Sequence, residues 1–172
     1  MHLVSVIMPY FKKRNYVEKS IRSVMSQTYK MFELIIVYDD TDHSDLSYIK
    51  KIINNNNKIK LIINSNNIGA GSSRNKGIKY SSGDFVAFID ADDYWYENKL
   101  TKQVDFINKN NFEFVFFNNE KITKNNKKVI LSKKSLNYDQ LIESCDIGLS
   151  TVILKKNIIE NISFPNLKTK ED

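Results

Sequence analysis

Short apolar runs alternate along the chain with longer segments in which apolar residues recur every three or four positions. The runs lie at residues 4–8, 34–37, 61–63, 85–89 and 112–117. Runs of this length predict buried strands, and the longer segments predict amphipathic helices that pack on them. Because strands and helices alternate, the pattern predicts an α/β fold in which helices flank a mainly parallel sheet.

The predicted helices have recognisable starts. Asn15, followed by Glu18, is typical of a capping box, in which two side chains bond backbone N–H groups at the start of a helix. A second helix is expected to begin near Ser44, and Gly69 and Gly71 open a third. A fourth helix follows the fourth apolar run.

A single domain is expected to span residues 1–172, because the sequence shows no linker, repeat or second boundary. A chain of this length can bury roughly two-thirds of its unfolded surface. The alternation weakens after Lys121, where residues 129–131 and 151–154 predict strands of a smaller, mixed C-terminal portion.

The chemistry-bearing residues of this pattern follow the strands. Ligands of open parallel sheets bind beyond the carboxyl ends of the strands. The residues that reach this edge are Pro9, Tyr10 and Phe11 after the first strand, Asp39 and Asp40 after the second, and Asp90, Ala91, Asp92 and Asp93 after the fourth. Their coincidence at one edge predicts a binding site there.

The acidic cluster after the fourth strand indicates a cation. Three carboxylates within four residues repel one another unless a positive group is present. A hard divalent cation supplies that charge and takes oxygen ligands. The alternative is an exposed acidic turn that caps the next helix. The wholly apolar run that precedes Asp90 favours the site.

Other templates for such a cluster fit less well. A calcium-binding loop starting at Asp90 would need an oxygen ligand where Tyr94 stands and glycine where Trp95 stands. A dinucleotide fold needs a glycine fingerprint after its first strand, and no glycine precedes Gly69. A phosphatase-like hydrolase with Asp90 as nucleophile stays open as an alternative, although its acidic motif would normally follow the first strand. The acidic triplet disfavours a receiver domain.

The net charge of +6 narrows the choice of partner. It suits nucleotide phosphates and acidic lipid headgroups, so peripheral association with the inner face of a membrane is compatible with it. The lysines are spread along the chain, and no aromatic-and-basic module of an RNA-binding domain is present. Nucleic acid is therefore excluded as a partner.

The termini and the rarer side chains add little chemistry. The N-terminal apolar run is too short for a membrane span and has no basic leader, so a cytoplasmic location is expected. Cys145 is the only cysteine. It fits a reducing compartment and is interpreted as a small buried side chain. His2 and His43 have no partner at metal-ligand spacing and are interpreted as surface residues.

Five ordered blocks within residues 4–93 resemble the inverting glycosyltransferases of family 2, whose fold is called GT-A. The blocks are VSVIMPYF, SIRSVMSQTY, FELIIVYDD, NIGAGSSRNKG and FIDADD. The resemblance implies a nucleotide-sugar-binding half over residues 1–120 and the start of an acceptor-side portion over 121–172. Members of the family usually continue with helices that shape the acceptor pocket, so this portion is expected to be incomplete.

The resemblance also implies roles for particular residues. Phe11 stacks on the base of a UDP-sugar, Asp40 accepts a hydrogen bond from it, and Asp92 holds Mg²⁺ or Mn²⁺. The implied donor-binding set is Pro9, Tyr10, Phe11, Asp39, Asp40, Gly71, Arg74, Asp90, Ala91 and Asp92. Arg74 would bind the diphosphate or, alternatively, pair with Asp90. Trp95 is expected either to line the acceptor side or to anchor the core.

The acidic pair Glu171 and Asp172 resembles the residues that supply the family's catalytic base, with Asp172 preferred. The expected reaction transfers a sugar with inversion to a hydroxyl of a saccharide or lipid-linked saccharide acceptor, in the making of a surface glycan. A donor-binding fragment without transferase activity is the alternative.

Overall fold

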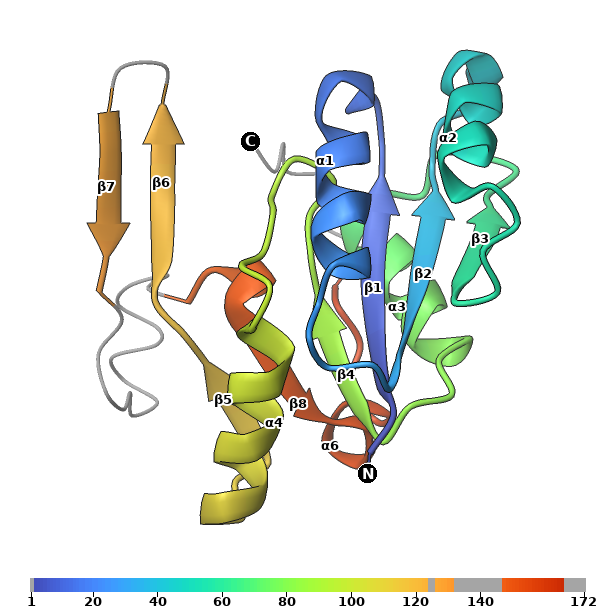
Figure 1. Ribbon diagram of the computed structural model, residues 1–172. Coiled ribbons are helices and arrows are strands. Elements are labelled where there is room, and N and C mark those ends of the chain that lie inside the picture. The colour runs from blue at the N-terminus through green and yellow to red at the C-terminus, as the bar shows by residue number, and fades with distance from the viewer. Residues whose placement is uncertain (1, 124–125, 132–146, 166–172) are drawn as a thin grey trace.

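A six-stranded sheet forms the centre of the computed structural model, which describes residues 2–123, 126–131 and 147–165. Its strand order is β3-β2-β1-β4-β8-β5, and helices cover both faces (Figure 1). The strands are β1 (Val4–Tyr10), β2 (Phe32–Tyr38), β3 (Ile59–Ile63), β4 (Phe85–Phe88), β5 (Phe114–Phe116) and β8 (Val152–Lys155).

Four of these strands are parallel, which confirms the predicted sheet. β1 pairs in parallel with β2 and β4, and β2 pairs in parallel with β3. β8 runs antiparallel between β4 and β5. The assignment of residues 151–154 to a separate smaller portion is therefore wrong. Ile153 and Leu154 pack on opposite faces of the sheet, so β8 is buried on both sides like a central strand.

Helices α1, α2 and α4 lie on one face of the sheet, and α3 and α6 lie on the other (Figure 1). The helical segments are α1 (Arg14–Met25), η1 (His43–Asp45), α2 (Leu46–Ile53), α3 (Ala70–Lys79), α4 (Lys99–Asn110), η2 (Leu149–Thr151) and α6 (Lys156–Ile159). No helix in the parts of the chain described above is long and apolar enough to cross a membrane.

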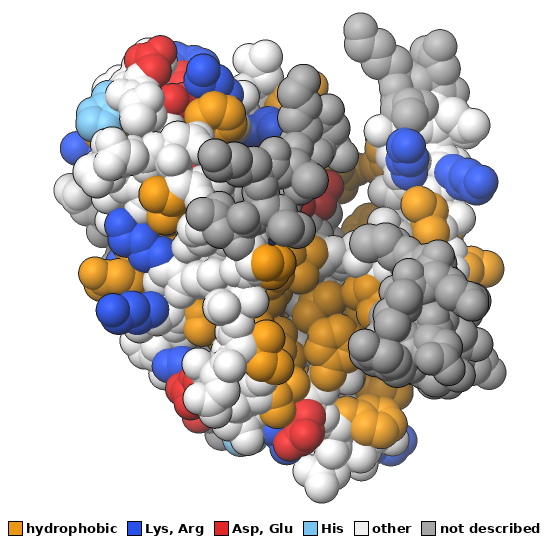
Figure 2. Space-filling view, turned by 180° about the vertical axis from the view of Figure 1, so that it is seen from behind, with side chains coloured by type: hydrophobic (Ala, Val, Ile, Leu, Met, Phe, Trp, Pro, Cys, Tyr) orange, Lys and Arg blue, Asp and Glu red, His pale blue; other side chains and the backbone are white. Residues whose placement is uncertain are grey.

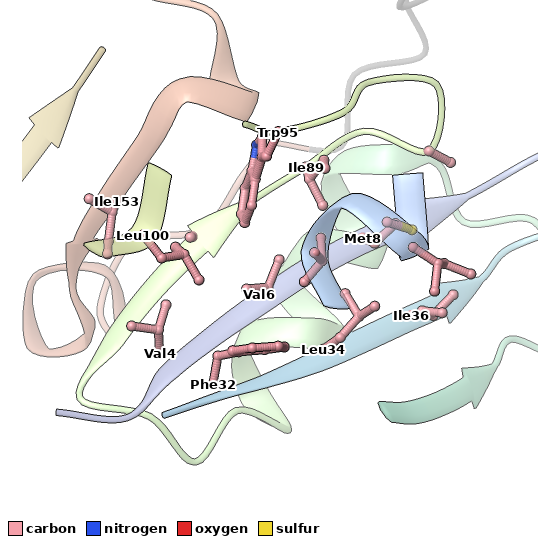
Figure 3. Close-up of a cluster of buried hydrophobic side chains, with 14 of the residues drawn as sticks. Val4, Val6, Met8, Phe32, Leu34, Ile36, Ile89, Trp95, Leu100 and Ile153 are labelled. Atoms are coloured by element: carbon pink, nitrogen blue, oxygen red, sulfur yellow. The ribbon is translucent and has the colours of Figure 1, made fainter. Parts of the chain in front are cut away.

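The larger core lies between the sheet and α1, α2 and α4. Alternate residues of a strand point to opposite faces, so Val4, Val6 and Met8 of β1 join this core while Ile7 joins the other. Trp95 and Leu100 close its end near α4, as Figure 3 shows. Both positions carry the chain out of the acidic turn, so the core fixes where that turn begins and ends.

The second core lies between the sheet and α3 and α6. Helix α3 approaches β1 closely at Gly77, where a Cβ atom would lie 2.5 Å from Ile7 Cγ2. Phe88 and Phe164 meet edge to face on the same side. Figure 2, which views the molecule from behind, shows hydrophobic side chains gathered near the middle of this face.

Helix α1 starts without the predicted capping box. It begins at Arg14, and its N-cap residue Lys13 makes no capping hydrogen bond with its side chain. Asn15 already lies inside the helix, so its prediction as the cap is wrong. Glu18 instead accepts a hydrogen bond from the Tyr48 hydroxyl at 2.7 Å. Glu18 therefore makes a contact between α1 and α2 in place of the predicted capping hydrogen bond.

A two-stranded hairpin stands beside the sheet. It consists of β6 (Asn119–Thr123) and β7 (Asn126–Ile130), which pair antiparallel. The hairpin confirms the strand predicted near residues 129–131. It forms a smaller portion toward the C-terminus, which was predicted as mixed and is antiparallel in the structure. Figure 1 shows it on the α4 side of the molecule, beyond β5.

Candidate functional site

The carboxyl ends of β1, β2 and β4 meet at one edge of the sheet. Tyr10 pairs with Tyr38 in the register of β1 and β2, and the Asp39 N–H donates to the Tyr10 carbonyl at 2.8 Å. On the other side of β1, the Ile89 N–H donates to the Ile7 carbonyl at 3.1 Å. The segments that follow these three strands therefore leave the sheet side by side.

The end of β1 presents one of its three predicted side chains to solvent. Phe11 is 45% exposed, whereas Pro9 and Tyr10 are buried. The Tyr10 ring stacks on Tyr38, and its hydroxyl donates to Asp45 at 2.6 Å. Burial, followed by the contact with Asp45, raises the pKa of Tyr10 above its usual value. The Tyr10 side chain therefore anchors the strand, and only the backbone of Tyr10 is available for the predicted contact with a donor.

A buried carboxylate that the sequence reasoning missed fixes this corner. Asp45 accepts the Tyr10 hydroxyl and also pairs with Arg14 at 2.8 Å. The hydrogen bond from Arg14, and then that from Tyr10, holds the pKa of Asp45 below its usual value. The first turn of α1 and the segment before α2 are thereby tied to the end of β1.

Asp39 and Asp40, which follow β2, are both buried. One oxygen of Asp39 accepts from the Asn64 side chain and the Ile68 N–H, and the other accepts from the Gly69 N–H at 2.8 Å. Asp39 therefore orders the loop before α3, where Gly69 has a φ of 84°. Asp40 accepts from the Asp42 N–H at 3.1 Å.

The turn at residues 90–93 is held from both sides. The Asp93 N–H closes it by donating to the Asp90 carbonyl at 3.0 Å. From α1, the Ser20 hydroxyl donates to the carbonyls of Ala91 and Asp93. From η2, the Ser150 hydroxyl accepts the Asp90 N–H at 3.1 Å. Ala91 is buried, so only its backbone is available at the edge.

Arg74 reaches this turn from α3. Its guanidinium is 7% exposed and lies 2.7 Å from Asp90 Oδ1. The Phe164 ring lies beneath it, with its centre 5.7 Å from Arg74 Cζ. Of the two alternatives for Arg74, the structure shows the pairing with Asp90. Arg74 thus orients a carboxylate of the site from below the surface.

Asp92 points to the other side of the turn, toward a lysine that the sequence reasoning missed. Lys13 Nζ lies 2.8 Å from Asp92 Oδ2, and both side chains are partly exposed. Burial, in first place, raises the pKa of Asp93, and the charges of Asp90 and Asp92 raise it further, whereas a hydrogen bond with Ser150 lowers it. Asp90 and Asp92 thus have separate cationic partners, whereas Asp93 keeps a raised pKa.

Gly71 does not face open space as expected for a donor contact. A Cβ atom there would lie 3.0 Å from the Pro165 carbonyl oxygen. The segment at Phe164 is held next to it by Asn75, whose side chain donates to the Phe164 carbonyl and accepts its N–H, both at 2.9 Å. Gly71 therefore makes room for the segment at residues 164–165.

Three predicted residues lie outside the described part of the chain. They are Cys145, Glu171 and Asp172. The two histidines lie at the surface as expected. His2 is near Asp84, and His43 contacts the edge of Tyr38.

A cavity of about 450 Å³ opens beside the acidic turn. It lies between that turn, the start of α4, η2 and the hairpin. Its walls include Asp92, Trp95, Lys99, Glu120 and Ser150. Trp95 is 7% exposed in the core, lines the cavity and donates from Nε1 to the Ser150 carbonyl at 2.8 Å. Its role as a core anchor is confirmed, and its place on the acceptor side stays a prediction.

Asp92 fits a metal that is held mainly by a ligand. Among residues 2–123, 126–131 and 147–165, no three His, Cys, Asp or Glu side chains converge as a protein-only metal site. Mg²⁺ in proteins is commonly held by one or two carboxylates together with substrate phosphates. A partly exposed carboxylate at the mouth of a cavity offers one such oxygen ligand.

A parallel sheet with an acidic turn after β4 at its carboxyl edge is the GT-A architecture of nucleotide-sugar-dependent transferases. A model described as glycosyl transferase family 2 matches residues 5–160. The chain therefore belongs to glycosyl transferase family 2, which confirms the resemblance seen in the five sequence blocks.

Two curated relatives come from Escherichia coli. The chain is 38% identical over 174 residues to the UDP-Glc:alpha-D-GlcNAc-diphosphoundecaprenol beta-1,3-glucosyltransferase WfgD, and the match covers 99% of this chain and 67% of that protein. It is 36% identical over 176 residues to WfaP, which carries the same activity name, with 100% of this chain and 68% of that protein covered.

Solved structures confirm the fold. TarS of S. aureus in complex with UDP-GlcNAc has a TM-score of 0.82 and 25% identity, covering 99% of this chain and 51% of that chain. A mannosyltransferase from Pyrobaculum calidifontis in complex with GDP-Man and Mn²⁺ has a TM-score of 0.73 and 16% identity, covering 96% of this chain and 48% of that chain. The chain thus spans about half the length of these solved proteins.

Proposed function

We propose that the carboxyl edge of the sheet binds a UDP-sugar and that the sugar is transferred to a hydroxyl of a saccharide acceptor. The observation that carries this proposal is the order of side chains along the edge. Phe11 is exposed at the end of β1 and Asp40 follows the neighbouring β2, whereas Asp92 lies past β4 at the cavity. A base would therefore sit at the β1–β2 end and the diphosphate toward β4. TarS with bound UDP-GlcNAc supports the choice of donor.

Each side chain in this arrangement supplies a simple interaction. The exposed Phe11 ring offers a stacking face, which for a nucleobase is worth about 1–3 kcal/mol. Asp40 offers a carboxylate oxygen to the N3–H of uracil. Asp90, which pairs with Arg74 at 2.7 Å, would face the ribose of the nucleotide. Asp39 keeps the loop before α3 in place and acts on the donor only through that loop.

Asp92 is the side chain that would hold Mg²⁺ or Mn²⁺. Such an ion, when bound, neutralises charge on the diphosphate and so makes it a better leaving group. Lys13 contacts the same carboxylate. An ion held by Asp92 would therefore compete with Lys13 for the same carboxylate.

The remaining roles rest on family membership. Asp172, or Glu171, would remove the proton of the attacking hydroxyl, and a single displacement would invert the anomeric carbon. The names of the two relatives from Escherichia coli support an acceptor in which a sugar is linked through a diphosphate to a lipid. With an acceptor of this kind the reaction would take place at a membrane surface, and a net charge of +6 favours the inner face, where anionic lipids lie.

The test measures UDP affinity by titration calorimetry with and without Mn²⁺. In the wild-type chain, Mn²⁺ is expected to strengthen UDP binding by about tenfold or more. Asp92→Asn, which keeps the shape of the side chain, should lose this gain and retain the metal-independent affinity. Asp105→Asn is the matched control, because Asp105 is exposed on α4 and is not among the residues that line the cavity.

An Asp92→Asn protein that keeps the full Mn²⁺ effect would contradict the metal role. A transfer assay with labelled UDP-glucose and a lipid-linked N-acetylglucosamine acceptor separates the enzyme from its alternative. A chain that binds UDP with Mn²⁺ but transfers no sugar would be a donor-binding fragment.

A further inference from the structure

The cavity beside the acidic turn contains a buried lysine that the proposed reaction does not use. Lys99, the first residue of α4, is 9% exposed and lines the cavity. Its Nζ lies 3.7 Å from the centre of the Trp95 ring. Within the described residues, this Nζ has no hydrogen-bond partner. Burial lowers the pKa of Lys99 well below its usual value.

The other charged groups of the cavity wall are differently placed. Three of its carboxylates each have a cationic partner. These ion pairs are Asp90–Arg74 at 2.7 Å, Asp92–Lys13 at 2.8 Å and Glu120–Lys127 at 2.8 Å. Lys102 is exposed and therefore hydrated. Among the described residues that line the cavity, Lys99 is thus the cation that is neither hydrated nor paired with a carboxylate.

The position of Lys99 in its helix is also unfavourable unless an anion is present. The first turn of α4 holds Lys99 and Lys102 and no acidic residue. The positive end of a helix dipole favours anions and disfavours cations. The cap residue Asn98 makes no side-chain hydrogen bond to this turn. The Gln27 side chain caps this turn instead, since its Oε1 accepts the Leu100 N–H at 3.0 Å. Two lysines at the positive end of the helix lower stability but create a local field that favours a negative group.

We propose that the α4 end of the cavity is a binding site for an oxyanion of the acceptor, with Lys99 as its central ligand. The chemical class is a phosphate ester or a carboxylate attached to a sugar. The inference rests on the proposed function, because the cavity borders Asp92, where the donor diphosphate would lie. A cavity of about 450 Å³ is in the range of small-ligand sites and accommodates a saccharide that carries such a group.

Folding has already removed water from the Lys99 amine. An anion that binds there does not have to displace that water, which strengthens its binding. The incoming oxyanion supplies the missing counter-charge and so raises the pKa of the Lys99 amine from its lowered value. A neutral sugar hydroxyl cannot supply that charge. The site therefore distinguishes acidic from neutral acceptors, and its occupation is marked by proton uptake.

The experiment titrates three probes into the chain by calorimetry: N-acetylglucosamine 1-phosphate, glucuronate and methyl glucoside. Lys99→Met keeps the length of the side chain and removes the amine. Lys102→Met is the matched control, because it removes an equal charge from the same helix turn at an exposed position. Titrations in buffers with different ionisation enthalpies measure the protons taken up.

In the wild-type chain, at least one acidic probe should bind about tenfold or more tighter than methyl glucoside, and its binding should be accompanied by proton uptake. Lys99→Met should lose both the preference and the proton uptake, whereas Lys102→Met should change the affinity by less than about threefold. A preference for the phosphate identifies a phosphate-linked acceptor, and a preference for glucuronate identifies an acidic sugar.

Unchanged binding of the acidic probes by a folded Lys99→Met chain would overturn the inference and leave Lys99 a core residue. So would equal affinity of the wild-type chain for all three probes. UDP binding is measured in parallel and should be the same in all variants. Absence of UDP binding in the wild-type chain would contradict the proposed function instead, so the two failures are distinguishable.

Discussion

At the residue scale, Asp39 and Asp40 are adjacent carboxylates that face different partners. Asp39 accepts three hydrogen bonds, two of them from the backbone of the loop before α3. Asp40 accepts one, from the Asp42 N–H. A buried carboxylate with all its hydrogen bonds made inside the protein stabilises a fold, whereas one with spare acceptor capacity at a ligand edge can bind a ligand. Their positions in sequence do not distinguish these roles, but their contacts do.

Asp39→Ala should therefore lower the free energy of unfolding more than Asp40→Ala does. The expected losses are about 3 kcal/mol for Asp39, whose removal leaves buried donors unpaired, and about 1 kcal/mol for Asp40. UDP affinity should show the reverse order when measured on folded protein. Urea unfolding and UDP titration of both variants check this, and a larger stability loss for Asp40→Ala would contradict the assignment.

At the element scale, the packing of α3 on β1 depends on a missing side chain. Gly77 faces Ile7, and an added Cβ would lie 2.5 Å from Ile7 Cγ2. Glycine costs helix stability relative to alanine, so a glycine inside α3 is retained here for the close approach. That approach brings Arg74, one turn earlier, to Asp90.

Gly77→Ala should lower the free energy of unfolding by about 1–3 kcal/mol, because the core cannot take the extra methyl group without moving the helix. Ile7→Ala, which removes the clashing atom, is the matched partner for a double-mutant cycle. The sum of the stability losses in the two single variants should exceed the loss in the double variant by about 0.5 kcal/mol or more. Strict additivity in urea unfolding would show that α3 tolerates the methyl group.

Local patterns predicted most elements but not how they assemble. Apolar runs located β1, β2 and β4, because strands buried on both faces are continuously hydrophobic. The place of β8 between β4 and β5 could not be predicted, since strand order depends on contacts between residues far apart in sequence. The start of α1 was also predicted wrongly: the helix begins at Arg14, and Glu18 contacts Arg22 and Tyr48 rather than the backbone at the helix start.

The sequence predicted those residues of the candidate site that directly follow the end of a strand. The carboxyl-edge rule found Asp40, Asp90 and Asp92, and it could also have found Lys13, which follows β1. Nothing local marked Ser150, whose place depends on β8 and whose hydroxyl meets a residue 60 positions away. Lys99 gave no signal either, because a lysine at a helix start looks solvent-exposed until its burial is known.

At the scale of the whole molecule, the excess of positive charge makes carboxylates important for stability in acid. The chain has 26 Lys and Arg residues against 20 Asp and Glu residues. Protonation of the carboxylates adds to the net charge and so increases repulsion in the folded state. Carboxylates with native cationic partners resist this protonation. Asp45 is the most enclosed of them and joins β1, α1 and the segment before α2.

Because the pKa of Asp45 is lowered in the folded chain, the unfolded chain binds more protons between the two pKa values. Its contribution to stability is therefore complete above the unfolded value of about 3.9 and is lost as the pH falls through the folded value. Asp45→Asn should be less stable at neutral pH and should lose less stability between pH of about 4 and about 2. Urea midpoints across this range test it, and parallel curves would contradict it.

The late position of β8 in the chain has a consequence for synthesis on the ribosome. β4 and β5 do not pair with each other, because β8 lies between them and bonds to both. A nascent chain that has emerged only to residue 151 therefore carries two unpaired strand edges, and such edges recruit other chains. Arrival of β8 fills the gap between β4 and β5 and completes the six-stranded sheet.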